Sequence, residues 1–251
     1  REALRQSLAQ QLEQPLWEIY LQLREQARNT EYRPEAGQIG RRRLQSMALS
    51  YLMLLKQTSS LLSQTTSLSA QATSLPGVIQ QSPDSVQSGE EVTRPSRVMT
   101  DGLGEPGNMG KSGQILSACI EQFEQADNMT ERLAALSNLV NSDAREQAEQ
   151  ALVRFGEEFA NEPLVMDQWF SVQASSPLFS DAAQIRKLME HKAFSIRNPN
   201  KVRAVLGAFS QHNLPQFHAA DGSGYALLAE QVAALDALNP QMSARMVNPL
   251  T

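Results

Sequence analysis

The chain has 251 residues, with 22 Lys or Arg against 27 Asp or Glu, so its formal net charge is −5 at pH 7. A mildly acidic chain is not expected to bind nucleic acid, because such surfaces carry an excess of basic residues. No stretch approaches the roughly 20 apolar residues that a membrane-spanning helix needs, so no membrane partner is expected. Cys119 is the only cysteine, which excludes an intrachain disulfide and favours a reducing compartment.

The first 56 residues are predicted to form helices, because apolar residues recur every three or four positions. Pro15 interrupts the first run, so two abutting helices are expected there, and Pro34 can occupy the first turn of the next helix. The predicted apolar stripes are Leu4, Leu8, Leu12, Leu16, Ile19 and Leu23, and then Ile39, Leu44, Met47, Ala48, Tyr51, Leu52 and Leu55.

Residues 57–114 interrupt the helical pattern. They are rich in Ser, Thr, Gln, Gly and Pro, they hold 7 of the 13 glycines, and no aromatic residue occurs between Tyr51 and Phe123. Such a segment buries too little apolar surface to offset the ordering of the chain, which costs about 1–2 kcal/mol per residue. A long, low-complexity, disordered insertion is therefore predicted at 57–114, with its first leucines able to prolong the preceding helix by a turn or two.

From residue 115 onward, short amphipathic helices are predicted in close succession. Thr130, Ser180 and Asn198 are the expected N-caps of three of them, and Pro163 the start of another. Asp143 and Glu146 are expected to form a capping box, and residues 221–224 a tight turn. Strand-like alternation is absent from the sequence, so the fold class is all-α, either a bundle or an α-solenoid of stacked antiparallel helix pairs.

The sequence has two stretches that resemble phosphate-binding motifs and three histidines, but none of them fits a phosphate or metal site. Residues 102–107 match G-x-G-x-x-G but follow no strand. Residues 110–112 resemble the end of a P-loop, but the upstream glycine that this motif requires would fall on Glu105. The three histidines, His191, His212 and His218, have no His-Glu-x-x-His spacing. We therefore expect no catalytic residue and no metal site within this chain.

Long collinear strings carry a resemblance to a known family. They cover nearly the whole chain outside the predicted insertion and comprise residues 2–8, 31–33, 127–137 (DNMTERLAALS), 164–177 (LVMDQWFSVQASSP), 194–203 (FSIRNPNKVR), 207–209, 217–225 (FHAADGSGY), 239–241 and Arg245. These strings resemble the C-terminal helical domain of bacterial-type aminopeptidase N, in the gluzincin family of zinc metallopeptidases. The resemblance implies a HEAT- or ARM-like α-solenoid.

The resemblance also implies a division of labour within a larger enzyme. The zinc and the glutamate base that hydrolyse the peptide would belong to a catalytic domain upstream in the same chain. Residues 1–251 would form a single helical C-terminal domain that packs over the catalytic domain, encloses the chamber for peptide substrates and controls access to it. Alone, this segment would be inactive and would bind no cofactor.

The resemblance implies three substrate-binding positions, Arg203, Gln241 and Arg245. The residues themselves agree with this, because Arg203 lies off the core stripe with Gly207 and Ser210, and Gln241 and Arg245 are four residues apart. A guanidinium group suits a carboxylate because it donates two parallel hydrogen bonds and stays charged. The alternative is that each arginine only pairs with a surface acid, which stabilises the fold by about 0–1 kcal/mol.

A second function class stays open at this point. A free-standing helical-repeat adaptor, which binds a protein or peptide in its concave face, would show the same pattern of helices. A His-Glu-x-x-His motif upstream in the same reading frame would favour the enzyme, and an immediate start codon would favour the adaptor.

Overall fold

The computed structural model describes residues 2–31, 33, 35–72 and 110–250, and over these ranges it contains helices and no strand. The helices are α1 (Glu2–Gln11), α2 (Glu13–Arg28), α3 (Ala36–Ala72), α4 (Lys111–Gln125), α5 (Met129–Val140), α6 (Arg145–Glu158), α7 (Pro163–Ala174), α8 (Ala182–Met189), α9 (Pro199–Val202), α10 (Ala208–His212), α11 (Leu214–Phe217), α12 (Ser223–Asp236) and α13 (Pro240–Met246). A π-helical turn (Arg203–Gly207) joins α9 to α10, and a 3₁₀ turn (Asn248–Leu250) follows α13.

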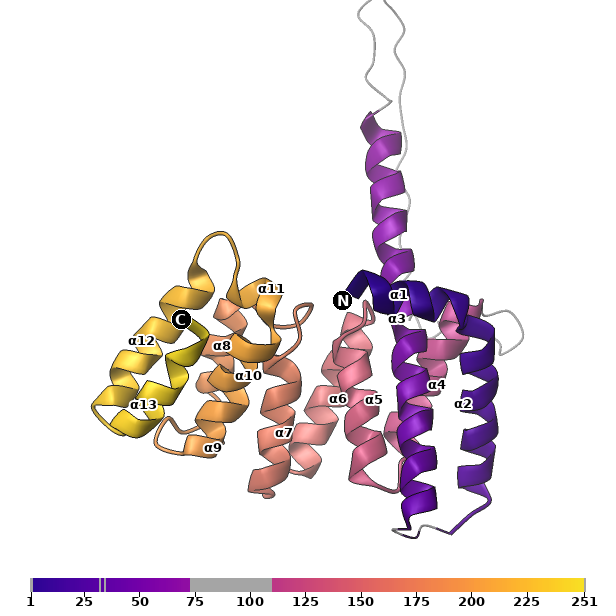
Figure 1. Cartoon of the computed structure of the whole chain (residues 1–251), viewed down its shortest axis with the longest axis horizontal. Helices are drawn as coiled ribbons and strands as arrows, with labels where there is room; N and C mark the ends of the chain where they lie inside the picture. Colours follow the sequence, from indigo (N-terminus) through magenta and orange to yellow (C-terminus); the bar gives the residue numbers. More distant parts are fainter. Residues whose placement is uncertain (1, 32, 34, 73–109, 251) are drawn as a thin grey trace, which may run out of the picture.

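The helices form a row in which neighbours in sequence are neighbours in space. Figure 1 shows this row running from α2 at one end to α12 and α13 at the other, with α1 lying across the helix ends near α3. The pairs α2–α3, α4–α5, α5–α6 and α12–α13 pack together directly. The predicted all-α solenoid is thus confirmed. No helix within the described ranges is long and apolar enough to cross a bilayer.

A continuous hydrophobic core holds the row together. Its largest fully buried side chains include Tyr20, Phe155, Phe170, Phe209 and Phe217, which come from five different helices. Burial of one such side chain stabilises the fold by roughly 1.5–3 kcal/mol relative to leaving it exposed. The core therefore extends from α2 to α11 and beyond, and holds each helix against its neighbours.

The apolar stripes predicted near the N-terminus are only partly buried. Helix α3 buries Ala48, Leu49, Leu52 and Met53, and α1 and α2 bury Ala9 and Tyr20. The predicted stripe residues that are exposed instead are Leu4, Leu8, Leu12, Ile19, Ile39, Leu44 and Met47. These helices carry more apolar residues than one face can bury, and the packing of the neighbouring helices selects which face is covered.

Helix α3 continues well past the predicted start of the insertion. It runs to Ala72, so residues 57–72 are helical, and α4 already begins at Lys111. Its second half projects away from the row of helices (Figure 1). A helix satisfies its own backbone hydrogen bonds, so a segment rich in Ser, Thr and Gln can still be helical. The remaining predicted insertion, residues 73–109, lies outside the described residues, as do Pro34 and the glycine motif at 102–107.

Several predicted helix caps are displaced by one or two residues. The N-cap of α5 is Asn128 rather than Thr130, and that of α8 is Asp181 rather than Ser180. In each case a side-chain oxygen accepts a hydrogen bond from the backbone N–H three residues later. Asn198 caps α9 as predicted.

The start of α7 and the break in the first apolar run agree with the predictions, whereas the start of α6 does not. Helix α7 begins at Pro163 as predicted, and the first apolar run breaks into two helices at Leu12. The predicted capping box at α6 does not form, because α6 begins at Arg145 and its N-cap, Ala144, offers no capping side chain.

Candidate functional site

A groove of about 520 Å³ lies between α7, the π-helical turn with α10, and α13. Its charged members are Arg203 and Arg245. The other side chains that line it are apolar or polar. The other residues that line it are Ser171, Val172, Ser175, Gly207, Ala208, Gln211, His212, Met242, Met246 and Asn248.

Arg203 is placed by the π-helical turn. The backbone N–H of Ala208 donates to the carbonyl of Arg203, five residues earlier, which makes this turn wider than an α-helical one. Ser171 of α7 donates its hydroxyl to the carbonyl of Ala204 at 3.2 Å, which ties the wide turn to the neighbouring helix. The guanidinium Nη1 of Arg203 donates to Asn200 Oδ1 at 3.1 Å and is otherwise exposed on the groove.

Arg245 is placed by the short helix α13. Asn239 caps this helix, accepting from the backbone N–H of Met242 at 3.0 Å, and Ser243 Oγ donates to the carbonyl of Val232 in α12 at 3.0 Å. Met242 and Met246 are buried beneath the helix, whereas Arg245 is exposed. Because α13 is fixed in this way, the exposed Arg245 side chain lines the groove together with Arg203.

The structure therefore brings together two of the three predicted binding residues. Gln241 is exposed in the first turn of α13 but is not among the described residues that line the groove. Ser210 was expected beside Arg203 on an open surface, but it is only 2% exposed. The π-helical turn explains this, because one extra residue rotates the following helix by about 100° relative to an unbroken α-helix.

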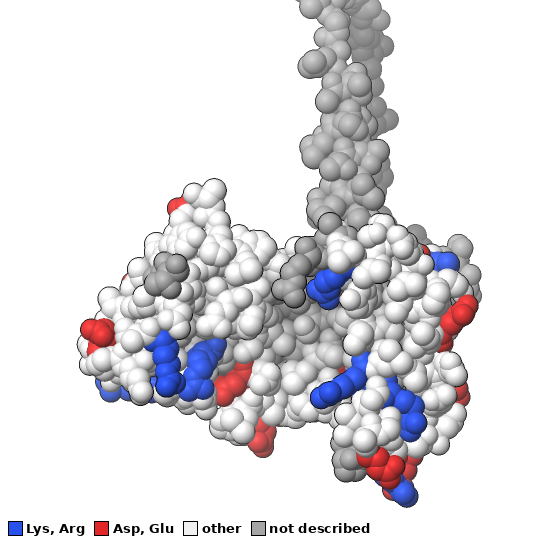
Figure 2. Space-filling view, in the orientation of Figure 1, with Lys and Arg blue, Asp and Glu red and all other residues white. Residues whose placement is uncertain are grey.

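The groove suits a negatively charged group attached to an apolar one. Two guanidinium groups face it, and no Asp or Glu is among its described lining residues. Figure 2 shows Lys and Arg side chains over α9 and α13, with acidic side chains beside them. A carboxylate can accept two parallel hydrogen bonds from one guanidinium group, and the methionines with Val172 offer an apolar surface.

Several parts of this site could not be anticipated from the sequence. Ser171, Gln211 and His212 come from other helices, and no sequence motif marks them as groove residues. The π-helical turn has no composition signature either. The one indication in the sequence is Gly207, four residues after Arg203. In the structure, a Cβ at Gly207 would lie 3.8 Å from both Arg203 Cβ and Met246 Cε.

Comparison with known proteins assigns the chain to a family. The family described as "Domain of unknown function (DUF3458_C) ARM repeats" matches residues 1–80 and 108–251. The chain belongs to this family. Its ARM-repeat description agrees with the row of packed helices seen here, and the DUF3458_C domain is therefore an α-solenoid in this protein.

Members of the aminopeptidase N group are similar to this DUF3458_C chain. Aminopeptidase N of Escherichia coli (strain K12) is 41% identical over 131 residues, which are 52% of this chain and 15% of that protein. Aminopeptidase N of Caulobacter vibrioides is 33% identical over 154 residues, which are 61% of this chain and 18% of that protein. The chain thus spans less than a fifth of the length of these relatives.

A solved structure shows the same likeness. The crystal structure of Legionella pneumophila aminopeptidase A in complex with aspartic acid matches 100% of this chain and 23% of its own, with a TM-score of 0.68 and 25% identity. Together these findings confirm the resemblance to the C-terminal helical domain of aminopeptidase N.

Proposed function

We propose that this chain is the C-terminal domain of a zinc-dependent aminopeptidase that removes N-terminal residues from peptides. In this proposal the domain caps the catalytic domain, encloses the substrate chamber and controls access, and it contributes no catalytic residue. The observation that carries the proposal is the similarity to aminopeptidases, combined with a groove that presents two arginines.

The metal of the proposed enzyme is assigned to the catalytic domain rather than to this chain. Among the described residues, no three or more His, Cys, Asp or Glu side chains gather into a group that could hold a metal ion. When bound upstream, zinc would activate the water that attacks the peptide bond. The residues of this domain would act on the other end of the substrate.

Within the groove, Arg203 and Arg245 are proposed to hold the C-terminal carboxylate of a peptide. Both side chains are exposed, and both extend toward the same space of about 520 Å³. Hydrogen bonds to charged groups contribute about 1.5–3 kcal/mol each. The apolar side chains beside them would contact the C-terminal residue of the peptide. Gln241, in the first turn of α13, stays a prediction as a further contact to the peptide.

The exposed apolar residues of the first three helices support a covering domain. Leu4 is 66% exposed and Met47 is 55% exposed, and Leu12 and Leu44 are also exposed. Exposed apolar side chains that gather into a patch are typical of a surface that contacts another protein part. We propose that the upstream catalytic domain covers this region.

The proposal is tested by steady-state kinetics on the full-length polypeptide. Arg203→Ala and Arg245→Ala should each raise the KM for a peptide of about six residues roughly tenfold, which corresponds to a loss of about 1.4 kcal/mol. The KM for an aminoacyl anilide, which has no distant carboxylate, should stay unchanged. A peptide amidated at its C-terminus should bind the wild-type enzyme as weakly as the free peptide binds the variants.

Arg186→Ala is the matched control. Arg186 is an exposed arginine of α8 whose Nη2 lies 2.6 Å from Glu230, away from the groove, so its loss should leave both KM values unchanged. Equal effects of Arg203→Ala on peptide and anilide would contradict the binding role. A full-length product without aminopeptidase activity would favour the adaptor instead, and zinc-dependent turnover by residues 1–251 alone would contradict the division of labour.

A further inference from the structure

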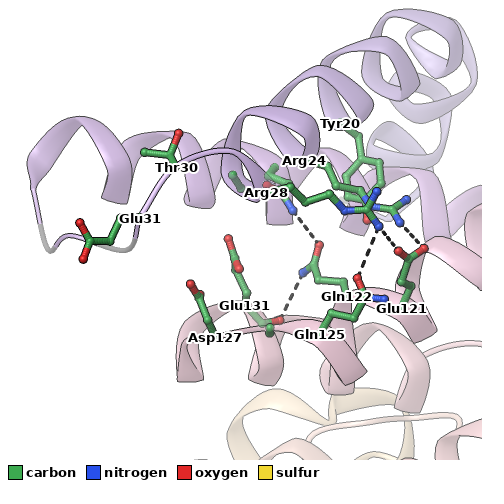
Figure 3. Close-up of a pocket in the computed structure, with 13 residues that line it drawn as sticks. Tyr20, Arg24, Arg28, Thr30, Glu31, Glu121, Gln122, Gln125, Asp127 and Glu131 are labelled. Carbon is green, nitrogen blue, oxygen red and sulfur yellow. Dashed lines mark hydrogen bonds and ion pairs between the residues drawn. The ribbon is translucent and has the colours of Figure 1, made fainter.

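A second cavity lies at the other end of the helix row, where α2 faces α4 and α5. Its volume is about 300 Å³, and it is distinct from the arginine groove, with which it shares no lining residue. Figure 3 shows its walls: side chains of α2 point down from one side, and those of α4, α5 and the turn between them point up from the other. Nothing in the proposed function uses this cavity.

One end of the cavity carries an excess of positive charge. Arg24 and Arg28 of α2 both pair with the carboxylate of Glu121 in α4 (Figure 3). Arg28 Nη2 also donates to Gln125 Oε1 at 3.4 Å. Two guanidinium groups offer ten N–H donors between them, far more than one carboxylate and one amide oxygen can accept. This end can therefore bind a further carboxylate.

Glu131 lies at the other end (Figure 3), and two residues that line the cavity, Glu131 and Gln45, each have a buried oxygen without a hydrogen-bond donor. Glu131 is 6% exposed; its Oε2 accepts from Asn128, but its Oε1 has no hydrogen-bond partner and lies 3.8 Å from Arg42 Nε. Gln45 is 4% exposed; its Nε2 donates to Gln122 Oε1 at 3.3 Å, and its own Oε1 has no partner.

Two such acceptors at one cavity are unfavourable, because each buried polar atom left unsatisfied costs about 1–3 kcal/mol. Burial also raises the pKa of Glu131, although the Asn128 hydrogen bond and the charge of Arg42 lower it in part. A ligand that brings a positive charge to this end would favour the ionised Glu131. Asp127 lies at the same end and adds negative charge there (Figure 3).

We propose that this cavity binds a free α-amino acid, with its carboxylate against Arg24 and Arg28 and its ammonium group directed at the acidic end that holds Glu131 and Asp127. The ligand class follows from the polarity of the cavity, which is cationic at one end and acidic at the other. An ammonium group brings a positive charge and three N–H donors to the acidic end. Tyr20, Ala27 and Ala126 also line the cavity and offer apolar contacts, which suit an apolar side chain such as that of leucine.

The test is isothermal titration calorimetry of the 251-residue chain with L-leucine. We expect saturable binding at one site, weakened at least tenfold for L-leucinamide, which lacks the carboxylate, and for N-acetyl-L-leucine, which lacks the ammonium group. Arg28→Gln should also weaken leucine binding at least tenfold. The Arg28 side chain is half exposed, so this variant is expected to fold, and its circular dichroism and unfolding midpoint verify that.

Glu131→Gln provides the second arm, since it keeps the shape of the side chain and removes its charge. Arg154→Gln is the control, because Arg154 is an exposed arginine of α6 paired with Glu124 and does not line the cavity. No leucine binding, equal binding of leucinamide, or unchanged binding by folded Arg28→Gln would each overturn the proposal. Arg203→Ala should leave leucine binding intact, so this test does not depend on the aminopeptidase proposal.

Discussion

Gly222 and Gly224 lie two residues apart, at the N-cap and in the first turn of α12, and each is required for a different physical reason. Gly222 has φ +71°, a left-handed conformation that costs a residue with a Cβ about 1–2 kcal/mol. Gly224 has an ordinary φ, but a Cβ there would lie only 2.3 Å from the carbonyl oxygen of Phe217. The sequence indicates a turn at this place, and only the packing of α11 against α12 distinguishes the two glycines.

Alanine substitutions should separate these two causes. We expect Gly224→Ala to lower the free energy of unfolding by more than about 2 kcal/mol, because backbone must move. Gly222→Ala should lower it by about 1 kcal/mol. Gly40→Ala is the control, since a Cβ there meets nothing within 4 Å and alanine favours the helix by up to about 1 kcal/mol. Urea unfolding gives all three values, and a smaller loss for Gly224→Ala than for Gly222→Ala would refute the assignment.

At the scale of the helix, the start of α5 shows how a cap is selected. Asn128 accepts from the backbone N–H of Glu131 at 3.0 Å and donates its Nδ2 to Glu131 Oε2 at 2.9 Å. The two residues thus satisfy each other across the first turn of the helix. Thr130 was the predicted cap, but it lies inside the helix and is exposed.

The two candidate caps of α5 give a direct comparison of sequence and structure. Asn128→Ala should lower the free energy of unfolding by about 1–2 kcal/mol, the usual cost of losing an N-cap. Thr130→Ala should change it by no more than about 0.5 kcal/mol, because an exposed helical position loses little. Chemical denaturation of the two variants beside the wild type measures both, and the reverse order would restore Thr130 as the cap.

The π-helical turn is the element on which the arginine groove depends. It sets the direction of Arg203 relative to α10 and turns Ser210 into the core, and Ser171 of α7 supports it through a hydrogen bond to Ala204. Wide turns of this kind occur frequently at functional sites. The position of Arg203 therefore depends on how α7, the π-helical turn and α10 pack together, and not on its own segment alone.

Across the whole molecule, folding places His191 in an aromatic environment. Its ring lies 5.1 Å from that of Trp169 and 5.5 Å from that of Phe170, and its Nδ1 accepts from the backbone N–H of Ala193 at 3.1 Å. Burial lowers the pKa of His191, and the charges of Lys192 and Lys201 lower it further. Lys201 is itself held by Asp167 at 2.7 Å.

The lowered pKa of His191 predicts a loss of global stability in mild acid. Below about pH 6.5 His191 is protonated in the unfolded chain but stays largely neutral in the folded chain. The unfolded state therefore binds more protons. The stability contributed by neutral His191 is thus complete above about pH 6.5 and falls as the pH drops toward the folded pKa. Unfolding free energies at pH 7.5 and 5.5 should show this fall, and it should be smaller in His191→Gln.

The comparison with His191→Gln isolates this residue from other titrating groups. Glu131 acts in the opposite sense, because its raised pKa makes the folded state lose stability as the pH rises through that pKa. Its contribution is the same in both proteins and cancels in their difference. An identical change between pH 7.5 and 5.5 in both proteins would contradict the role of His191.

The sequence by itself determined the all-α class, most helix positions after residue 115 and the resemblance to one family. These are local or collinear properties: the three-to-four-residue apolar period, caps such as Asn198, helix starts such as Pro163, and strings shared with relatives. It also indicated Arg203 and Arg245 through those strings. The end of α3 at Ala72 was not predicted, because the backbone hydrogen bonds of a helix do not depend on the composition that marked the insertion.

Only the tertiary structure decided which apolar faces are buried and where polar groups meet. Met47 satisfies the helical period as well as Leu52 does, yet one is 55% exposed and the other fully buried, because burial depends on neighbouring helices. For the same reason Arg245 lines the groove whereas Gln241, four residues earlier, does not, and Glu131 came together with Gln45 and Arg28 from distant parts of the chain around one cavity. Periodicity specifies a side chain's angle on its own helix, and packing specifies what that side chain contacts.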